Sequence, residues 1–216
     1  MTRITTSFVL LGVFLLARAT ASATEPFKTD VTGKINTEWV PDVDHLEPYD
    51  GKVGIPEYYY LAQFIQAGAM QAEGSYLVVI RTDDRRYLLQ ATTVPTEKLL
   101  SKPAKPDVEV EIPESLAAVI YDLWVNALLE VRYERKQHGG FDGETYLFST
   151  FVMSLGWMHG TTWSPEGDLP PVWMMDAGKK LIAFARDQKR DSKTTEAELR
   201  ILRDKLFQYI KAHGRH

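Results

Sequence analysis

Hydrophobic and polar residues alternate with the period of a β-strand in two parts of the chain. Residues 75–94 form two β-rich runs on either side of Asp83 and Asp84, which predicts a β-hairpin. Residues 145–152 and 157–163 predict a second hairpin of the same kind. Because hairpins pair antiparallel strands, we expect an antiparallel sheet of about four strands.

Helical periodicity is found in four other segments. Residues 55–74 have apolar side chains at helical spacing, and a proline and a glutamate stand in the expected first turn. Residues 114–137 carry a wide apolar stripe that ends before two glycines, and residues 172–187 follow two prolines. Thr195 with Glu198 three positions later forms a capping box, which predicts the start of the last helix.

Two weaker strand signals accompany these elements. One is the short run 35–40, and the other is Val108, Val110 and Ile112, which alternate with glutamates as in an acidic edge strand. The predicted order is helix, hairpin, helix, hairpin, helix, helix. This order predicts an α+β fold in which about four helices pack on one face of the sheet.

The start of the chain has the features of an export signal. Arg3 precedes the apolar run Phe8–Leu16, and the small residues Ala21 and Ala23 are spaced as a signal-peptidase site requires. The run is shorter than the roughly 20 apolar residues that cross a bilayer. We therefore expect residues 1–23 to be a signal peptide cleaved after Ala23, with an uncleaved amphipathic anchor as the alternative.

The rest of the chain divides into an arm and a domain. Residues 24–54 are polar, with several prolines and aspartates, and predict an irregular arm. Residues 55–214 predict a single α+β domain, because this length suffices for one core. The apolar share of the chain, 44%, is typical of a globular protein and too high for a disordered one.

Cysteine content and charge restrict the chemistry and the partners. The chain contains 0 Cys, which excludes disulfides, thiolate metal sites and a cysteine nucleophile. Its formal net charge is -4, which argues against nucleic acid and anionic membrane surfaces, since both need a basic face. We expect a periplasmic or secreted protein without a stable membrane span, and another envelope protein as its partner.

Sequence motifs of the common catalytic and cofactor sites are missing. There is no G-x-S-x-G elbow, no S-x-x-K pair, no P-loop and no G-x-G-x-x-G turn. Asp42 and Asp44 begin like a calcium loop, but Leu46 and Glu47 stand where an oxygen ligand and a glycine are needed. A solvated acidic turn explains this segment better, and we expect no metal ion and no cofactor.

Two histidines support a catalytic alternative. His138 precedes Asp142 and Glu144, and such a set near His159 would suit zinc binding or acid–base chemistry. His138 also falls at a predicted helix C-terminus, where the helix dipole favours an imidazolium, and Asp142 precedes a glycine as in a turn. The structural interpretation is favoured, and the alternative is a hydrolase that uses His159 or His138 with Asp142 or Glu144.

Aromatic residues concentrate on the second hairpin. One face of its second strand carries Trp157, His159, Thr161 and Trp163. The other face carries two glycines, which indicates that a helix or another backbone packs close there. The first interpretation is that the aromatic side chains are core. The second is a binding face whose anchors are Trp157, His159, Trp163 and Tyr146.

Taken together, these patterns favour a non-enzymatic binding module over an enzyme. We expect an exported protein of the bacterial envelope, of an inhibitor or immunity type. The hydrolase above is one alternative. A structural protein without a small-molecule site is the other, and it would associate with itself through the edge strand at 108–112.

Overall fold

A computed structural model describes residues 59–68, 71, 73–95, 106–131 and 143–213. All of them belong to the second of two compact units, Ile35–His216. They form one six-stranded antiparallel sheet and three helices. The strands are β1 (Tyr59–Gly68), β2 (Glu73–Arg81), β3 (Tyr87–Pro95), β4 (Val108–Ile112), β5 (Glu144–Val152) and β6 (Gly156–Trp163). The helices are α1 (Glu114–Leu129), α2 (Pro170–Arg186) and α3 (Ser192–His213).

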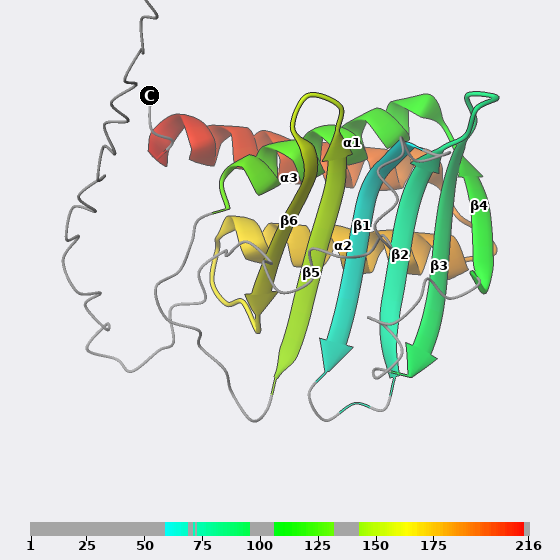
Figure 1. Cartoon of the computed structure of the whole chain (residues 1–216), viewed down its shortest axis with the longest axis horizontal. Coiled ribbons are helices and arrows are strands. Elements are labelled where there is room, and N and C mark those ends of the chain that lie inside the picture. Colours follow the sequence, from blue (N-terminus) through cyan, green and yellow to red (C-terminus); the bar gives the residue numbers. More distant parts are fainter. Residues whose placement is uncertain (1–58, 69–70, 72, 96–105, 132–142, 214–216) are drawn as a thin grey trace, which may run out of the picture. The chain divides into compact units, whose positions relative to one another are not determined.

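The sheet consists of a meander and an added hairpin. Its strand order is β4-β3-β2-β1-β5-β6, so the first four strands are neighbours in both sequence and space (Figure 1). The hairpin of β5 and β6 follows α1 and pairs with the outer side of β1, where Phe64 lies opposite Phe148. In the described residues, β4 and β6 are therefore the two edges of the sheet.

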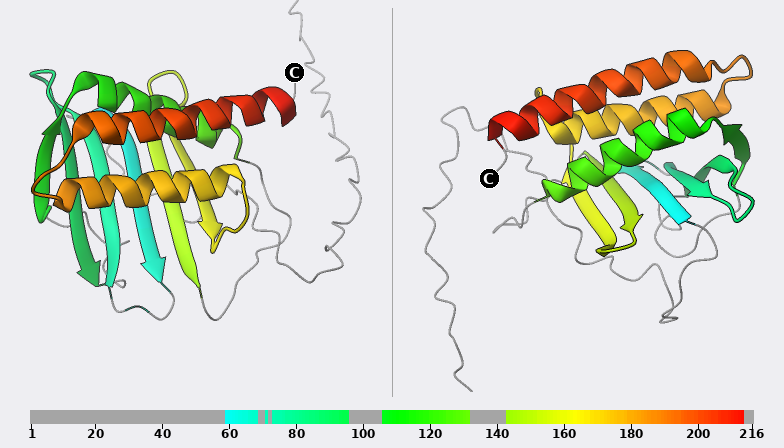
Figure 2. Two further views of the ribbon diagram at one scale, coloured as in Figure 1. Left: turned by 180° about the vertical axis from the view of Figure 1, so that it is seen from behind. Right: turned by 90° about the horizontal axis from the view of Figure 1, so that it is seen from above.

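All three helices lie on one face of the sheet (Figure 2). Helix α1 contacts β1, β5 and β6, and α2 contacts β2, β3 and β4. Helix α3 packs against α1 and α2 on the side away from the sheet. We call the two sides of the sheet the helix-covered face and the helix-free face.

The core fills the space between the helix-covered face and α1 and α2. Its centre includes Phe64, Trp124 and Phe148, each with 0% of its surface exposed. Gly178 of α2 lies so close to the Phe64 ring that an added Cβ would be 2.5 Å from a ring carbon. A glycine is required here because it lets α2 approach β1 more closely than any side chain would allow.

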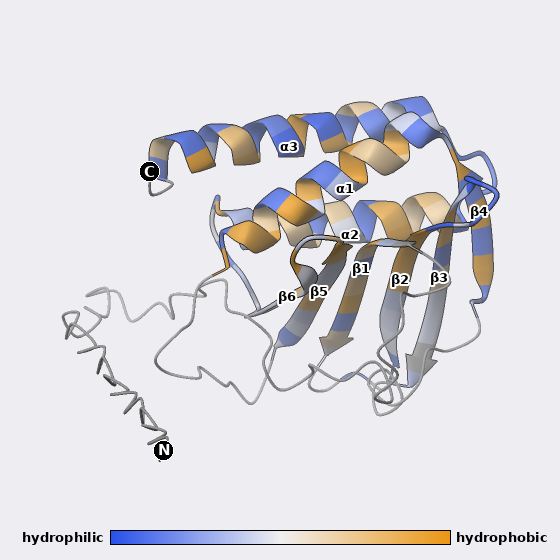
Figure 3. Cartoon of the chain, turned by 45° about the horizontal axis from the view of Figure 1, so that its top comes forward, coloured by the Kyte–Doolittle hydropathy of each residue, from blue (hydrophilic) through white to orange (hydrophobic). Residues whose placement is uncertain are grey.

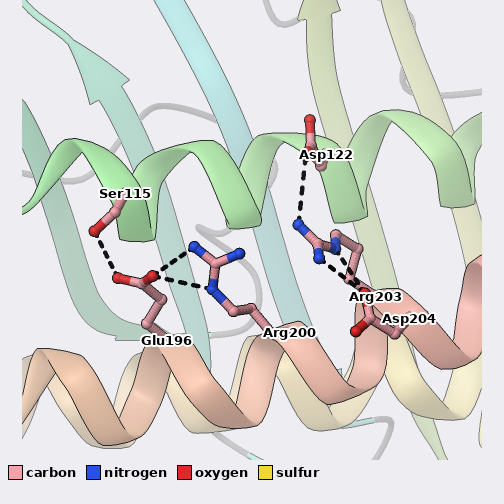
Figure 4. A network of polar contacts seen from close by, with 6 residues as sticks. All are labelled: Ser115, Asp122, Glu196, Arg200, Arg203 and Asp204. Carbon is pink, nitrogen blue, oxygen red and sulfur yellow. Dashed lines mark hydrogen bonds and ion pairs between the residues drawn. The ribbon is translucent and has the colours of Figure 1, made fainter.

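Polarity decides how α3 is oriented. Only Leu199 and Leu206 of this helix are fully buried, and its exposed residues are mostly hydrophilic, with Ile201 and Phe207 as exceptions (Figure 3). Its contact with α1 is bordered by polar groups, among them Ser115, whose hydroxyl donates to Glu196 at 2.6 Å (Figure 4). Arg203 lies 3.8 Å from the carboxylate of Asp122 on α1. Partly exposed pairs of this kind contribute little to stability, so apolar contacts hold α3 in place. They are made by Leu199 and Leu206, together with the partly buried Leu202, Tyr209 and Ile210.

The prediction of an α+β fold with an antiparallel sheet is confirmed, but the numbers of strands and helices were wrong. In the segment 55–74, which was predicted to be a helix, the described residues form strand β1 and the start of β2. The residues on both faces of β1 are largely apolar, because Phe64 faces the helices and Ile65 faces away. Two apolar faces on one strand imitate the spacing of a helix, which explains the error.

The other predicted elements are largely present. Both hairpins, the edge strand at 108–112 and three of the four predicted helices occur. The last helix begins at Ser192 instead of Thr195, because Asp191 caps it: its Oδ1 accepts from the Lys193 N–H at 3.0 Å. The arm 24–54, the run 35–40 and residues 132–137 lie outside the described residues. Among the described helices, none is long and apolar enough to cross a membrane.

Candidate binding surface

The hairpin of β5 and β6 presents two different sides. Met158, Gly160 and Thr162 face α1, and Met158 packs against the core. The alternate residues Trp157, His159, Thr161 and Trp163 therefore lie on the helix-free face. These four side chains are half-buried, so the helix-free side of the hairpin stays in contact with solvent.

A β-bulge brings a further aromatic residue to this side. The pairing of β1 with β2 shifts between Tyr60 and Ala62, so that Tyr60 lies opposite Ile80 while Ala62 lies opposite Val79. The extra residue turns Tyr60 onto the helix-free face, as bulges commonly do. Leu61 is the extra residue of the bulge and has no partner in the register with β2. Its carbonyl accepts a hydrogen bond from the buried Thr150 hydroxyl at 2.8 Å, which stabilises the bulge.

Tyr60 joins three rings of the hairpin. The Trp157 ring centroid lies 5.3 Å from that of Tyr60, 5.6 Å from Phe151 and 5.9 Å from the His159 ring, which stacks on it. We call Tyr60, Phe151, Trp157 and His159 the aromatic cluster. Pairs at these distances attract by more than area burial alone, so the rings form a preorganised platform.

The turn of the hairpin extends this apolar surface. Met153 and Leu155 are 72% and 61% exposed, although both are large and hydrophobic. No aspartate, glutamate, lysine or arginine occurs from Thr145 to Pro165, whereas 25% of the whole chain is charged. An exposed apolar patch without charges is a common sign of a protein-binding site.

The tryptophans of the two faces differ in their hydrogen bonds. In the core, the Trp124 indole donates to the Gln63 carbonyl at 2.8 Å, and Trp173 donates to Asp168 at 2.7 Å. No described residue accepts a hydrogen bond from the indole of Trp157 or Trp163. Their N–H groups therefore remain available to water or to a bound molecule.

Trp163 is held more rigidly than Trp157. Its ring lies against Gly143, where an added Cβ would be 2.5 Å from a ring carbon. A substitution at Trp163 would consequently disturb the start of β5. Trp157 is the better residue for testing binding, because its contacts are with other rings of the cluster.

Polar groups are interspersed with the cluster. The His159 Nδ1 lies 2.9 Å from the Ser149 hydroxyl on the neighbouring strand. Nearby, the Gln63 amide donates to the Tyr76 hydroxyl at 3.2 Å. Burial raises the pKa of Tyr76 to about 12, with a further contribution from Tyr60, so this phenol stays neutral at physiological pH. The surface thus carries hydrogen-bonding groups and no described carboxylate.

Tyr146 and Glu144 lie on the opposite side of β5. Tyr146 is only 2% exposed, stacks on Phe64 and donates a hydrogen bond to Glu144. Glu144 also accepts from Gln66 at 2.9 Å and lies 3.5 Å from Lys179 of α2. Burial alone would raise the pKa of Glu144, but these hydrogen bonds and the Lys179 charge lower it overall. The candidate surface is therefore built without Tyr146.

Of the histidine–carboxylate set of the hydrolase hypothesis, only His159 and Glu144 lie in the described residues, and these two are not brought together. His159 and Glu144 are on opposite faces of the hairpin, since Glu144 shares the side of Tyr146 and Phe148. His138 and Asp142 lie outside the described residues. Within the described ranges, no group of three or more histidine, aspartate or glutamate side chains is arranged to hold a metal ion.

Sequence reasoning missed part of this surface. Tyr60 was expected on a helix, and only the bulge in β1 shows that it reaches Trp157. Phe151, Met153 and Leu155 were not singled out, although the absence of charge from Thr145 to Pro165 was a signal available in the sequence.

Comparisons with known proteins add no identity to this geometry. No protein-family model matches the chain, and no curated protein or solved structure does so either. The functional argument therefore rests on the surface itself.

Proposed function

We propose that this protein is an exported binding protein of the bacterial envelope, of an inhibitor or immunity type. It would bind another envelope protein through the helix-free side of the β5–β6 hairpin. The observation that carries the proposal is the combination of the aromatic cluster with the exposed Met153 and Leu155 on a charge-free hairpin. Aromatic anchors on a rigid sheet are typical of binding hot spots.

The chemistry of the surface favours a partner with an apolar or aromatic patch. The described cluster has no carboxylate and no lysine or arginine, so a charged partner site would lose solvation without gaining a counter-ion. The neutral donors and acceptors of Ser149 and Gln63, which are half-buried, would satisfy a few polar groups of the partner. This arrangement supports a binding function better than a catalytic one.

The proposal is tested by capturing the partner protein and then measuring its affinity for this chain. The full chain is expressed in a host that exports it, and the purified product is used as bait for an envelope extract. A protein captured in a stoichiometric amount is then purified, and its Kd is measured by calorimetry. Trp157→Ala should weaken this Kd by at least about tenfold, because tryptophan anchors commonly contribute that much.

Phe207→Ala is the matched control. Phe207 is an exposed ring on α3, 40% accessible and 5.7 Å from the Arg203 guanidinium, on the far side of the helices. Its removal should leave the Kd unchanged. Failure of the native bait to capture any stoichiometric protein would contradict the proposal, and so would a Kd that Trp157→Ala does not alter.

Export itself is tested on the same product. Cleavage after Ala23 would remove residues 1–23, leave Thr24 as the N-terminus and place the arm 24–54 before the domain 55–214. Intact mass spectrometry should therefore find a protein that begins at Thr24 in the periplasm or medium. A product that retains residues 1–23 would contradict a cleaved signal peptide.

A hydrolase remains the second candidate, because Ser149 and His159 are within hydrogen-bonding distance. Such a pair would allow the histidine to accept a proton from the serine hydroxyl during nucleophilic attack. A fluorophosphonate probe should then label Ser149 in the native protein and fail to label His159→Ala. Absence of labelling at Ser149 would contradict the hydrolase and leave binding as the remaining proposal.

A further inference from the structure

The two edges of the sheet have opposite characters. Strand β4 has 5 residues, carries the exposed Glu109 and Glu111, and is bounded by Pro106 and Pro113. Short length, charge and flanking prolines are features that prevent an edge strand from pairing with another chain. Strand β6 has 8 residues and neither a charge nor a proline. The edge of β6 therefore lacks the protection that β4 has.

The backbone groups on the outer side of β6 can be identified from its pairing. Ser164 donates its N–H to the Glu144 carbonyl at 2.8 Å, and the register places Gly160 opposite Phe148. Bonded pairs alternate along an antiparallel ladder, so the even-numbered residues of β6 direct their backbone groups toward β5. Trp157, Thr161 and Trp163 direct theirs toward the outer edge. No strand in the described residues pairs with that edge.

The sequence of β6 is complementary to itself when reversed. If two copies pair antiparallel about Gly160, Trp157 lies opposite Trp163 of the second copy, and Thr161 lies opposite His159 of the second copy. Gly160 then meets its own equivalent, where the absence of a side chain permits close approach. Aromatic pairs would thus form at both ends of the new ladder, and polar pairs would form at its middle.

We propose that the β6 edge joins two copies of this chain into a dimer with one continuous antiparallel sheet, in the register centred on Gly160. Charge supports a second copy as the occupant. Each chain has a net charge of -4, yet the β6 strands that meet carry no charge, so the repulsive groups stay away from the contact. The same pairing at β4 would oppose two pairs of glutamates. The pairing also places the two aromatic clusters on the same side of the joined sheet.

The dimer is tested by its mass as a function of concentration. Sedimentation equilibrium of the exported product should give a dimer that dissociates on dilution. Thr161→Pro removes an outward N–H without touching the ladder to β5, and Thr161→Lys places a charge in the contact. Each variant should raise the dimer dissociation constant by at least about tenfold, which is the loss expected for one central contact.

Matched variants separate this edge from unspecific effects. Thr161→Val keeps the shape of the side chain and the backbone N–H, so its dimer should persist. Glu109→Lys changes the charge of the other edge and should also leave the dimer intact. Melting curves of all four variants establish that each one folds. A native protein that stays monomeric at every concentration would overturn the proposal, and so would a dimer that both the proline and the lysine variants retain.

Cross-linking tests the register. Because the native chain has no cysteine, His159→Cys and Thr161→Cys each introduce a single thiol. Residues directly opposite in a bonded antiparallel pair have Cα atoms about 5.5 Å apart, within the range of a disulfide. With oxidised glutathione as the oxidant, an equimolar mixture of the two variants should form more covalent dimer than either variant alone. Equal yields would overturn the register. This test is independent of the partner experiment, because it involves no other protein.

Discussion

The two faces of the sheet differ in what covers them, and the difference separates stability from recognition. On the helix-covered face, Phe148 has no exposed surface and contacts both Phe64 and Trp124. Three residues further along the same strand, Phe151 lies on the helix-free face and is half-buried against Trp157. One strand therefore carries the same residue type in a closed core and in an accessible cluster. We expect the first to determine whether the protein folds and the second to determine what it binds.

Removal of the core phenylalanine should have the largest effect. Phe148→Ala leaves a cavity between the sheet and α1, and we expect the free energy of unfolding to fall by about 3–5 kcal/mol. Urea denaturation followed by circular dichroism measures this change. A loss below about 1 kcal/mol would show that the helix-covered face is not the structural core.

The contact between Glu144 of β5 and Lys179 of α2 should make the stability of the protein depend on pH. The native pKa of Glu144 lies below its ordinary value of 4.5, so the folded state favours the ionised carboxylate. This contribution is present above pH 4.5 and is lost as the pH falls through the lowered native pKa. Glu144→Gln should therefore reduce the free energy of unfolding by about 1–2 kcal/mol at neutral pH. The difference from the native protein should shrink as the pH falls below 4.5.

Glu198→Gln is the control for this effect. Glu198 lies 2.5 Å from Lys180 in an exposed pair, and such pairs contribute about 0–1 kcal/mol. A pH-independent difference for Glu144→Gln would contradict the proposed role of its charge. It would leave only packing to explain the link between β5 and α2.

Removal of the accessible phenylalanine should have the smallest effect on stability. Phe151→Ala loses one ring contact and part of an exposed surface, so we expect a cost of about 1 kcal/mol. The same urea experiment compares it directly with Phe148→Ala. Equal costs at the two positions would remove the distinction between the faces.

Much of the fold could be predicted because several elements carry local signals. The hairpin of β2 and β3 has alternating residues on either side of Asp83 and Asp84, and the structure places the turn there. Strand β1 could not be predicted in this way. It lies in the middle of the sheet, with Phe64 and Ile65 on its two sides, and the bulge at Tyr60 interrupts what alternation it has. Only pairing with β2 and β5 makes this segment a strand.

The candidate surface was partly visible in the sequence. Strand alternation correctly placed Trp157, His159 and Trp163 on one side of β6, because a strand has a period of two. It could not show which side of the sheet the helices cover, and so Tyr146 was included in the predicted binding face with these three residues. It also could not join Tyr60 to Trp157, since that contact depends on a bulge and on the arrival of β5 beside β1.

The position of β1 in the sheet has a consequence for the folding of the chain. Strands β1 to β4 can pair with their neighbours in sequence, but β5 reaches β1 only after α1, and the contact of Gln66 with Glu144 spans 78 positions. Closing so long a loop costs entropy before its contacts form, so we expect this pairing to be a late step. Until then the apolar strand β1 is an open edge on which newly made chains would aggregate. Pulse-labelled hydrogen exchange should show β2 and β3 protected before β5, and simultaneous protection would contradict this order.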